Sequence, residues 1–354
     1  MAPWIATGWL GFCVAGLSLA IFVASCFWPG RSLSTRQLPA DVFRIGTGIA
    51  FAGWVHPAFG ILAVLGAVWW VQRGWERLPG GTLWPLVAMA WFLLLQVPTW
   101  VMDGAIAGFL AIGVIQVILA ACQAFHIPIF YVPGMIHGTL GHRTGLGIFL
   151  AVLTPLAFGT DWGWWLFGVY SVGIGLSASS VAAGTQLAGL VWVRPDLWPL
   201  ALIGAMGLSV SRFVVVQVRP SFTWGWRHVG DSWRARRQIW ASTWRRARQW
   251  PAWLVGHGQG TFQLHGRRWL KRDAHTELYR EVHNDYLETF YEVGVVGFAA
   301  LAWWMLGLPW RWHDPATGML IAFAVAMLAS FPARVATISQ LGLFAMALVT
   351  RGLP

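Results

Sequence analysis

One polar segment of the sequence combines residues that are suited to acid–base chemistry. His283 and Asn284 open it, and Asp285, Glu288 and Glu292 follow at spacings that place three carboxyl groups on one helical face. A neutral imidazole can accept a proton from a substrate hydroxyl, and a nearby carboxylate can orient or stabilise it. The segment therefore predicts a general base at His283 with acidic supporting residues.

The same segment also has a purely structural explanation. Asn284 is a good cap for the helix that follows, and acidic residues in a first turn complement the helix dipole. Gly294 and Gly297 let neighbouring helices approach closely. Spacing alone leaves the catalytic and the structural explanations both open.

Arginines upstream of this segment are candidates for binding phosphate. Arg236 and Arg237 lie in R-R-Q-I-W, 236–240, and a guanidinium presents a planar fork of donors that suits phosphate. Arg212 lies within an apolar run, where an ionisable residue is a functional hypothesis by default, although its side chain could also snorkel to the interface. A merely solvated basic face is the alternative for all three.

Basic residues are concentrated around these arginines. Of the 24 Lys and Arg residues, 13 fall within 219–283, against four acids, and only Lys271 is a lysine. An Arg-rich loop beside a membrane could bind phosphorylated lipid. The alternative is a GC-rich genome that codes Arg by default, combined with ordinary attraction to anionic headgroups.

The composition indicates a membrane protein. The 354 residues are 57% hydrophobic and 10% charged, with 27 Trp and 21 Phe, and the mean hydropathy is +0.60. Soluble domains have about 45–50% apolar and about 25% charged residues. Soluble globular, disordered, fibrous and nucleic-acid-binding proteins are therefore excluded, and a lipid bilayer is the expected partner. The three Cys lie in apolar runs and the loop histidines lack zinc-site spacing, so no disulfide framework or metal site is expected.

Apolar runs predict an all-α, polytopic transmembrane bundle of about 10–12 helices with one large loop that carries amphipathic helices. The run 42–72 is either one tilted helix or a hairpin broken at His56-Pro57, and 182–193 either stands alone or merges with the preceding helix. We expect a single integral membrane domain made of N-terminal helices in 1–218, an Arg/Trp-rich loop at 219–283 and C-terminal helices in 284–354. The expected spans are 4–28, 42–56, 57–72, 82–100, 104–126, 144–160, 162–180, 182–193, 197–218, 286–308, 315–332 and 335–351.

The loop at 219–283 is too rich in tryptophan for a flexible linker. From Asp231 to Trp250 its tryptophans share related helical faces and its arginines occupy the others, which predicts an amphipathic helix on a membrane interface that Pro251 ends. The Gly-rich stretch 256–260 is read as a turn. Positive-inside counting does not orient the loop, because the rule weakens beyond about 60 residues.

Three segments together resemble the O-antigen ligase and polymerase superfamily of bacterial membrane glycosyltransferases. H-N-D-Y-L-E-T-F-Y-E-V-G-V-V-G at 283–297 fits the pattern His-Asn, nine residues, Gly, two residues, Gly. R-R-Q-I-W at 236–240 and the Gly-rich P-A-W-L-V-G-H-G-Q-G-T-F at 251–262 are similar to the segments that precede it. G-T-L-G-H-R-T-G-L-G-I-F-L-A-V-L-T-P at 138–155 resembles the superfamily's helix-opening segment. The resemblance covers about residues 130–310.

The resemblance implies an enzyme that needs no metal or cofactor and lies in the bacterial inner membrane with loop 219–283 in the periplasm. It implies a catalytic His283, with Arg236, and Arg237 or Arg212, at the diphosphate of an undecaprenyl-diphosphate-linked glycan donor. The acceptor would be lipid A-core or another glycan, and nucleic acid would not be a partner. Ligase, polymerase and protein-glycosylating activities stay open.

One position departs from the superfamily. In S-A-S-S-V-A-A at 177–183, Ser180 stands where members commonly carry an arginine. Either Arg212 or Arg143 replaces that arginine, or the donor is handled differently. A different class of protein, a non-catalytic polytopic transporter or lipid-binding membrane protein, predicts a dispensable His283 and a cytoplasmic loop.

Overall fold

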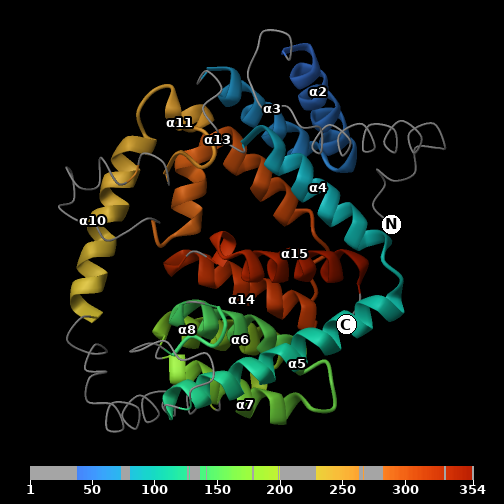
Figure 1. Cartoon of the computed structure of the whole chain (residues 1–354), viewed down its shortest axis with the longest axis vertical. Coiled ribbons are helices and arrows are strands. Elements are labelled where there is room, and N and C mark those ends of the chain that lie inside the picture. The colour runs from blue at the N-terminus through green and yellow to red at the C-terminus, as the bar shows by residue number, and fades with distance from the viewer. Residues whose placement is uncertain are drawn as a thin grey trace. The chain divides into compact units, whose positions relative to one another are not determined.

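The computed structural model describes residues 38–72, 80–125, 127, 136–140, 142–177, 179–197, 199, 229–262, 266, 282–330 and 332–352. The predicted span 4–28 lies outside these residues, and so does the predicted span 197–218, which includes Arg212, apart from residues 197 and 199. Within the described ranges every regular element is a helix (Figure 1), which confirms the all-α prediction. The polytopic bundle and the large loop remain predictions.

Helix boundaries fall close to the predicted ones, because Pro, Gly and polar residues bound the apolar runs. The described part of the chain holds twelve α-helices and two short 3-10 helices. In chain order they are α2 (Leu38–Val55), α3 (Pro57–Gln72), α4 (Gly80–Gln96), α5 (Thr99–Ala124), α6 (Arg143–Ala157), α7 (Gly163–Ser177), α8 (Ser180–Val193), η2 (Pro195–Leu197), α10 (Val229–Ala247), α11 (Ala252–Val255), α13 (Asp285–Leu306), α14 (Pro315–Ala329), η4 (Pro332–Arg334) and α15 (Ala336–Arg351).

The run 42–72 is a helical hairpin and not one tilted helix. α2 ends at Val55 and α3 begins at Pro57, because a proline lacks the N–H that a continuing helix needs but is well suited to a first turn. A Cβ placed on Gly60 would lie 2.8 Å from the Cα of Gly53. Glycine at both positions therefore lets the two helices pack closely.

The chain divides into two compact units. The first comprises 1–96, 239–281 and 287–308, and the second comprises 97–238, 282–286 and 309–354. In the first unit, aromatic side chains from α3, α4 and α13 form a core: the ring of Trp304 lies 4.5 Å from Phe59 and 5.6 Å from Trp91.

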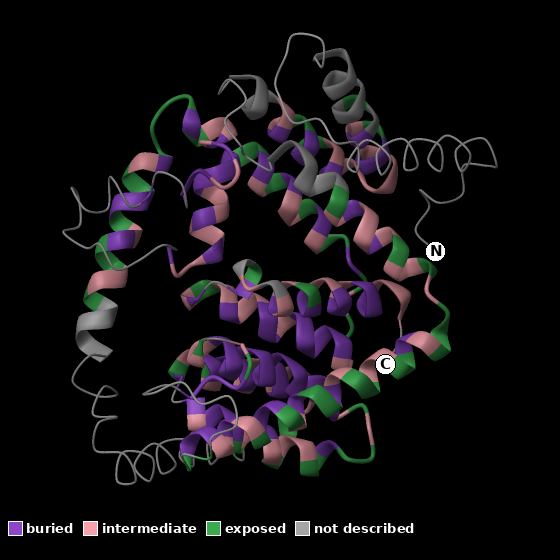
Figure 2. Cartoon of the chain, viewed as in Figure 1, coloured by how far each residue is buried: buried purple, intermediate pink, exposed green. Residues whose placement is uncertain are grey.

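Helix α6 is the central helix of the second unit. It packs against α7, α8 and α14, and its residues from Gly145 to Ala157 are all buried (Figure 2). Gly147 lies against Ala182 near the start of α8, while Thr154, two turns later, accepts a hydrogen bond of 3.2 Å from Gln186. Helices α6 and α8 therefore run parallel.

Helix α14 runs antiparallel to α8. Gly318, near the start of α14, packs against Gly189 and Val193 near the end of α8. The two helices are of nearly equal length, so the last residue of α14, Ala329, lies at the end where α6 and α8 begin. We call this end of the second unit the site end.

Helix α13 is interrupted at Gly294, where an unbroken span was predicted. Gly294 has φ 66°, and the N–H groups of His257 and Gly258 donate to the carbonyls of Tyr291 and Glu292, both at 2.9 Å. In a continuous helix those carbonyls would accept from the amides four residues later. The amides of the Gly-rich turn thus supply hydrogen bonds that the helix itself would otherwise make. The predicted turn at 256–260 is confirmed.

Among the helices that the structure describes, α5 and α13 are long and apolar enough to cross a membrane. On α5 the side chains of Ile112, Ile115 and Ile118 form an exposed apolar stripe. Contact of such an apolar stripe with lipid costs little free energy, whereas its contact with water is unfavourable.

Candidate active site

His283 has a left-handed backbone conformation immediately before α13. Its φ is 57°, which costs a non-glycine residue about 1–2 kcal/mol and is a kind of strain that clusters at functional sites. Burial first, and then the positive charge of Arg236 and the proximity of His142, lower the pKa of His283 to about 3. The imidazole is therefore neutral at neutral pH, and in this state of the protein it is a weaker base than an ordinary histidine.

His142, the residue before α6, belongs to the same cluster. Its pKa is lowered by desolvation first and then by Arg143, Arg236 and His137, although the residue as a whole is exposed. The charge of Arg236 lowers the pKa of both His142 and His283. These three side chains therefore lie close together at the site end.

Arg236 is anchored to the end of α14. Its Nη1 donates to the carbonyl oxygen of Ala329 at 3.0 Å, and the carbonyls in the last turn of a helix lack an internal donor and carry partial negative charge. A guanidinium has five N–H donors, so this bond does not exhaust its capacity. The neighbouring Arg237 is exposed. Of the two predicted phosphate ligands, Arg236 is the one brought to the cluster.

Three predicted acidic residues are buried on one face of α13. Asp285, Glu288 and Glu292 are 1%, 0% and 2% exposed. Asp285 Oδ2 accepts from the N–H of Ala333 at 2.8 Å, which ties η4 to the residue that follows Asn284 at the site end. Asp285 therefore supports the segment that carries His283.

Three further predicted residues, Glu292, Gly294 and Gly297, belong to the first unit. Glu292 Oε1 accepts from the N–H of Gly260 at 2.9 Å and so stabilises the Gly-rich turn. Gly294 allows the backbone around Gly256 to approach, and Gly297 packs against Val293. These contacts agree with the structural explanation of the glycines.

Two helix N-termini add positive potential to the site end. Helices α6 and α8 begin there side by side, and neither has an acidic residue in its first turn. The unpaired N–H groups and the macrodipole of an N-terminus favour anions. With Arg236 and Arg143, the site end is suited to a multiply charged anion.

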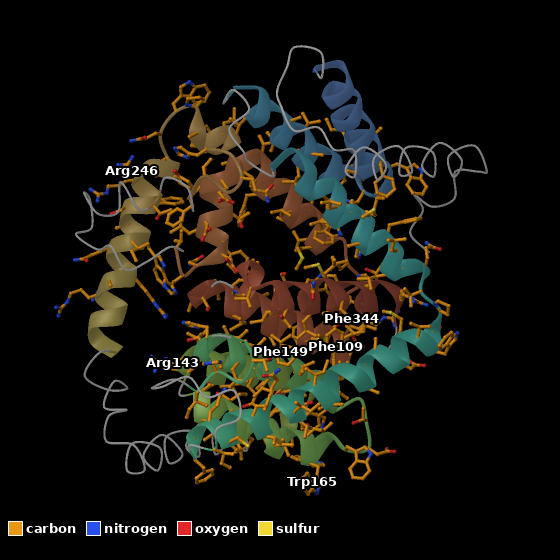
Figure 3. All side chains as sticks on the ribbon, viewed as in Figure 1. Phe109, Arg143, Phe149, Trp165, Arg246 and Phe344 are labelled. Carbon is orange, nitrogen blue, oxygen red and sulfur yellow. The ribbon has the colours of Figure 1, made fainter. Side chains whose placement is uncertain are left out.

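Two arginines could replace the one that is absent at Ser180, and the structure describes Arg143 of the two. Arg143 is the first residue of α6 (Figure 3) and stands one turn before Gly147, which packs against Ser179. It therefore lies on the helix that neighbours Ser180. Arg212 lies outside the described residues.

Sequence reasoning missed His142 and His137 and two glutamines of α5, Gln116 and Gln123. The glutamines could have been found, because polar residues within an apolar span are functional candidates. Within the described ranges, no three His, Cys, Asp or Glu side chains are grouped closely enough to hold a metal ion. His257 stacks on Tyr291, with ring centroids 4.2 Å apart.

Comparison with known proteins bears on this arrangement. Residues 141–302 match the model of a protein family described as O-antigen ligase, and the match includes His142, Arg236 and His283. No curated protein and no solved structure matches the chain. The cluster of His142, Arg236 and His283 therefore lies within a segment that is similar to the O-antigen ligase family.

Proposed function

We propose that the protein transfers a glycan from an undecaprenyl-diphosphate-linked donor to an acceptor hydroxyl. The observation that carries the proposal is the proximity of His283, which is neutral at neutral pH, to Arg236 at the site end. A base and an anion site side by side are what the displacement of a diphosphate by a hydroxyl requires.

In the proposed reaction His283 accepts the proton of the acceptor hydroxyl. As the proton leaves, the oxygen of that hydroxyl attacks C1 of the donor sugar. The bond between C1 and the diphosphate oxygen breaks, and the diphosphate leaves with the bonding electrons. Arg236 donates to the leaving oxygens and stabilises their growing charge. Arg237 and Arg212 remain candidates for further contacts to the diphosphate.

The donor itself would adjust the base. Burial first, and then the positive charge of Arg236, lower the pKa of His283, and a bound diphosphate would offset the second of these two effects. The pKa of His283 would then rise toward neutrality, where a general base is most effective. Donor binding would thus precede efficient proton transfer.

The reaction would take place at the periplasmic face of the bacterial inner membrane, with loop 219–283 on that side. The acceptor would be lipid A-core for a ligase or a second lipid-linked glycan for a polymerase, and a protein acceptor is a further alternative. The proposed mechanism uses side chains alone and involves no metal or cofactor.

The test compares surface-polysaccharide ladders from cells that carry wild type or His283→Asn at matched membrane levels. Asparagine tolerates a positive φ, so this variant removes the base without forcing the backbone to change. His313 also has a positive φ, of 63°, and His313→Asn is the matched control.

We expect His283→Asn to abolish the ladder and to accumulate lipid-linked donor, while His313→Asn keeps the ladder. Complete loss of polysaccharide from lipid A-core would indicate a ligase, and retention of a single repeat unit would indicate a polymerase. An unchanged ladder for His283→Asn would refute glycan transfer by this histidine and favour a non-catalytic membrane protein.

A further inference from the structure

Two buried glutamines of α5 hold the backbone that leads into α6. Gln123 Oε1 accepts from the N–H groups of His137 at 2.9 Å and Gly138 at 3.0 Å, and its Nε2 donates to the Gly138 carbonyl at 2.9 Å. Gln116 Oε1 accepts from the Thr139 N–H at 2.9 Å, and its Nε2 donates to Thr139 Oγ1 at 2.6 Å. We call Gln116, Gln123 and residues 137–139 the amide clamp.

The amide clamp is specific in its geometry. Gln123 and Gln116 are 0% and 6% exposed on a mostly apolar helix, where a buried amide is costly unless it is hydrogen-bonded. Gly138 has φ 57°, and a Cβ at this position would collide with Gln116 Oε1. Only glycine therefore lets both glutamines reach the backbone.

The segment that the clamp fixes leads directly to Arg143. Arg143 is the first residue of α6, where the helix dipole disfavours a cation. No carboxylate of the described residues lies within ion-pair distance of it. Its placement is unfavourable for an isolated helix and becomes favourable when an anion binds.

A second observation at the same segment also indicates a ligand. The side chain of His137 is 8% exposed, and its Nδ1 has no hydrogen-bond partner among the described residues. A buried ring nitrogen without a partner costs stability. A polar ligand at the site end would reduce this cost.

We propose that the amide clamp positions Arg143, and that Arg143 contacts the donor diphosphate together with Arg236. This inference rests on the proposed function. Gln116 and Gln123 do not touch the donor: they are positioning residues that fix the start of α6. Arg143 is the residue that binds phosphate.

The test uses the full-length protein in nanodiscs with undecaprenyl diphosphate as the binding probe. We expect Arg143→Gln to weaken probe binding about tenfold, because a hydrogen bond to a charged group is lost. Gln123→Met, which keeps the side-chain length and removes the amide, should also weaken binding about tenfold. In the transfer assay both variants should raise KM for the donor and leave kcat within about twofold.

The double variant Arg143→Gln/Gln123→Met distinguishes positioning from a general loss of packing. If Gln123 acts through Arg143, the double variant binds the probe no more weakly than Arg143→Gln alone. Gln186→Met is the matched control. Gln186 is a buried residue of α8 whose amide donates hydrogen bonds to the side chains of Thr154 and Ser171, both on helices, and not to the backbone of a loop. It should bind the probe like wild type.

Additive losses in the double variant, or an equal loss in Gln186→Met, would overturn the inference. Gln116→Met reports on the same clamp if Gln123→Met does not accumulate in the membrane. If His283→Asn abolishes transfer while Arg143→Gln and Gln123→Met bind the probe like wild type, only this inference fails. If His283→Asn leaves transfer intact, the proposed function fails.

Discussion

At the scale of single residues, the lowered pKa of His283 makes the stability of the folded protein depend on pH. In the folded protein it is lowered to about 3, from an ordinary value of 6.5. Between these two values the unfolded chain binds a proton that the folded chain does not, so stability falls as the pH falls from 6.5 toward 3, by at most about 1.4 kcal/mol per pH unit.

We therefore expect the thermal unfolding temperature of the detergent-solubilised protein to fall less between about pH 7 and pH 4 in His283→Asn than in wild type. The asparagine has no titratable ring and tolerates the same backbone conformation. The two proteins should differ little in pH dependence above about pH 7.5, where the imidazole is neutral in both states. Equal acid sensitivity in the two would show that burial of His283 does not contribute.

The neighbouring arginines Arg236 and Arg237 give a second residue-scale prediction. Arg236 bonds Ala329 and lies beside His283, whereas Arg237 is exposed. We expect Arg236→Gln to lower kcat/KM for the donor about tenfold or more, and Arg237→Gln to change it by less than about twofold. Donor titrations on the two variants measure this, and a reversed order would assign the phosphate contact to Arg237.

At the scale of elements, the Gly-rich turn and the kink of α13 depend on each other. A Cβ on Gly294 would collide with the backbone of Leu254 and Gly256, and its φ of 66° disfavours any L side chain. We expect Gly294→Ala to lower stability by about 2–4 kcal/mol, measured as thermal unfolding in detergent.

Gly108→Ala is the matched control for Gly294→Ala. Gly108 lies on α5, and a methyl group added there would have no heavy atom of the described residues within 4 Å. Alanine at this position should therefore be neutral or raise stability by up to about 1 kcal/mol. Similar losses in both variants would mean that any added methyl group is harmful, and that the kink itself has no special requirement for glycine.

The positions of the helices could be predicted from the sequence better than the kink in α13 and the contacts between distant segments. Periodicity and the His56-Pro57 break located the helices, whereas the base predicted at His283 stays a prediction. The kink at Gly294 was not predictable, because it depends on hydrogen bonds from residues 257 and 258, more than 30 positions earlier in the chain. The partners of Gln116 and Gln123 were missed for the same reason: nothing local indicates which backbone a buried amide will bond.

At the scale of the whole molecule, the remaining prediction concerns orientation in the membrane. Helix α6 leads from the site end to the turn around Asp161, over about 22 Å for its 15 residues. If α6 crosses the bilayer, exposed residues at its two ends face opposite compartments. Gln238 on α10 is exposed within the second unit, two residues after Arg236, and Asp161 is exposed at the far turn.

We expect Gln238→Cys, in a background without Cys13, Cys26 and Cys122, to react in spheroplasts with a membrane-impermeant maleimide. Asp161→Cys should react only in inverted vesicles, because the proposed function puts the donor in the periplasm, which would leave the other end of α6 facing the cytoplasm. The reciprocal pattern would put the site end in the cytoplasm and refute periplasmic transfer. Labelling of both positions from one side would show that α6 does not span the membrane. The orientation would then have to be tested on α5 and α13, which among the described helices are long enough to cross.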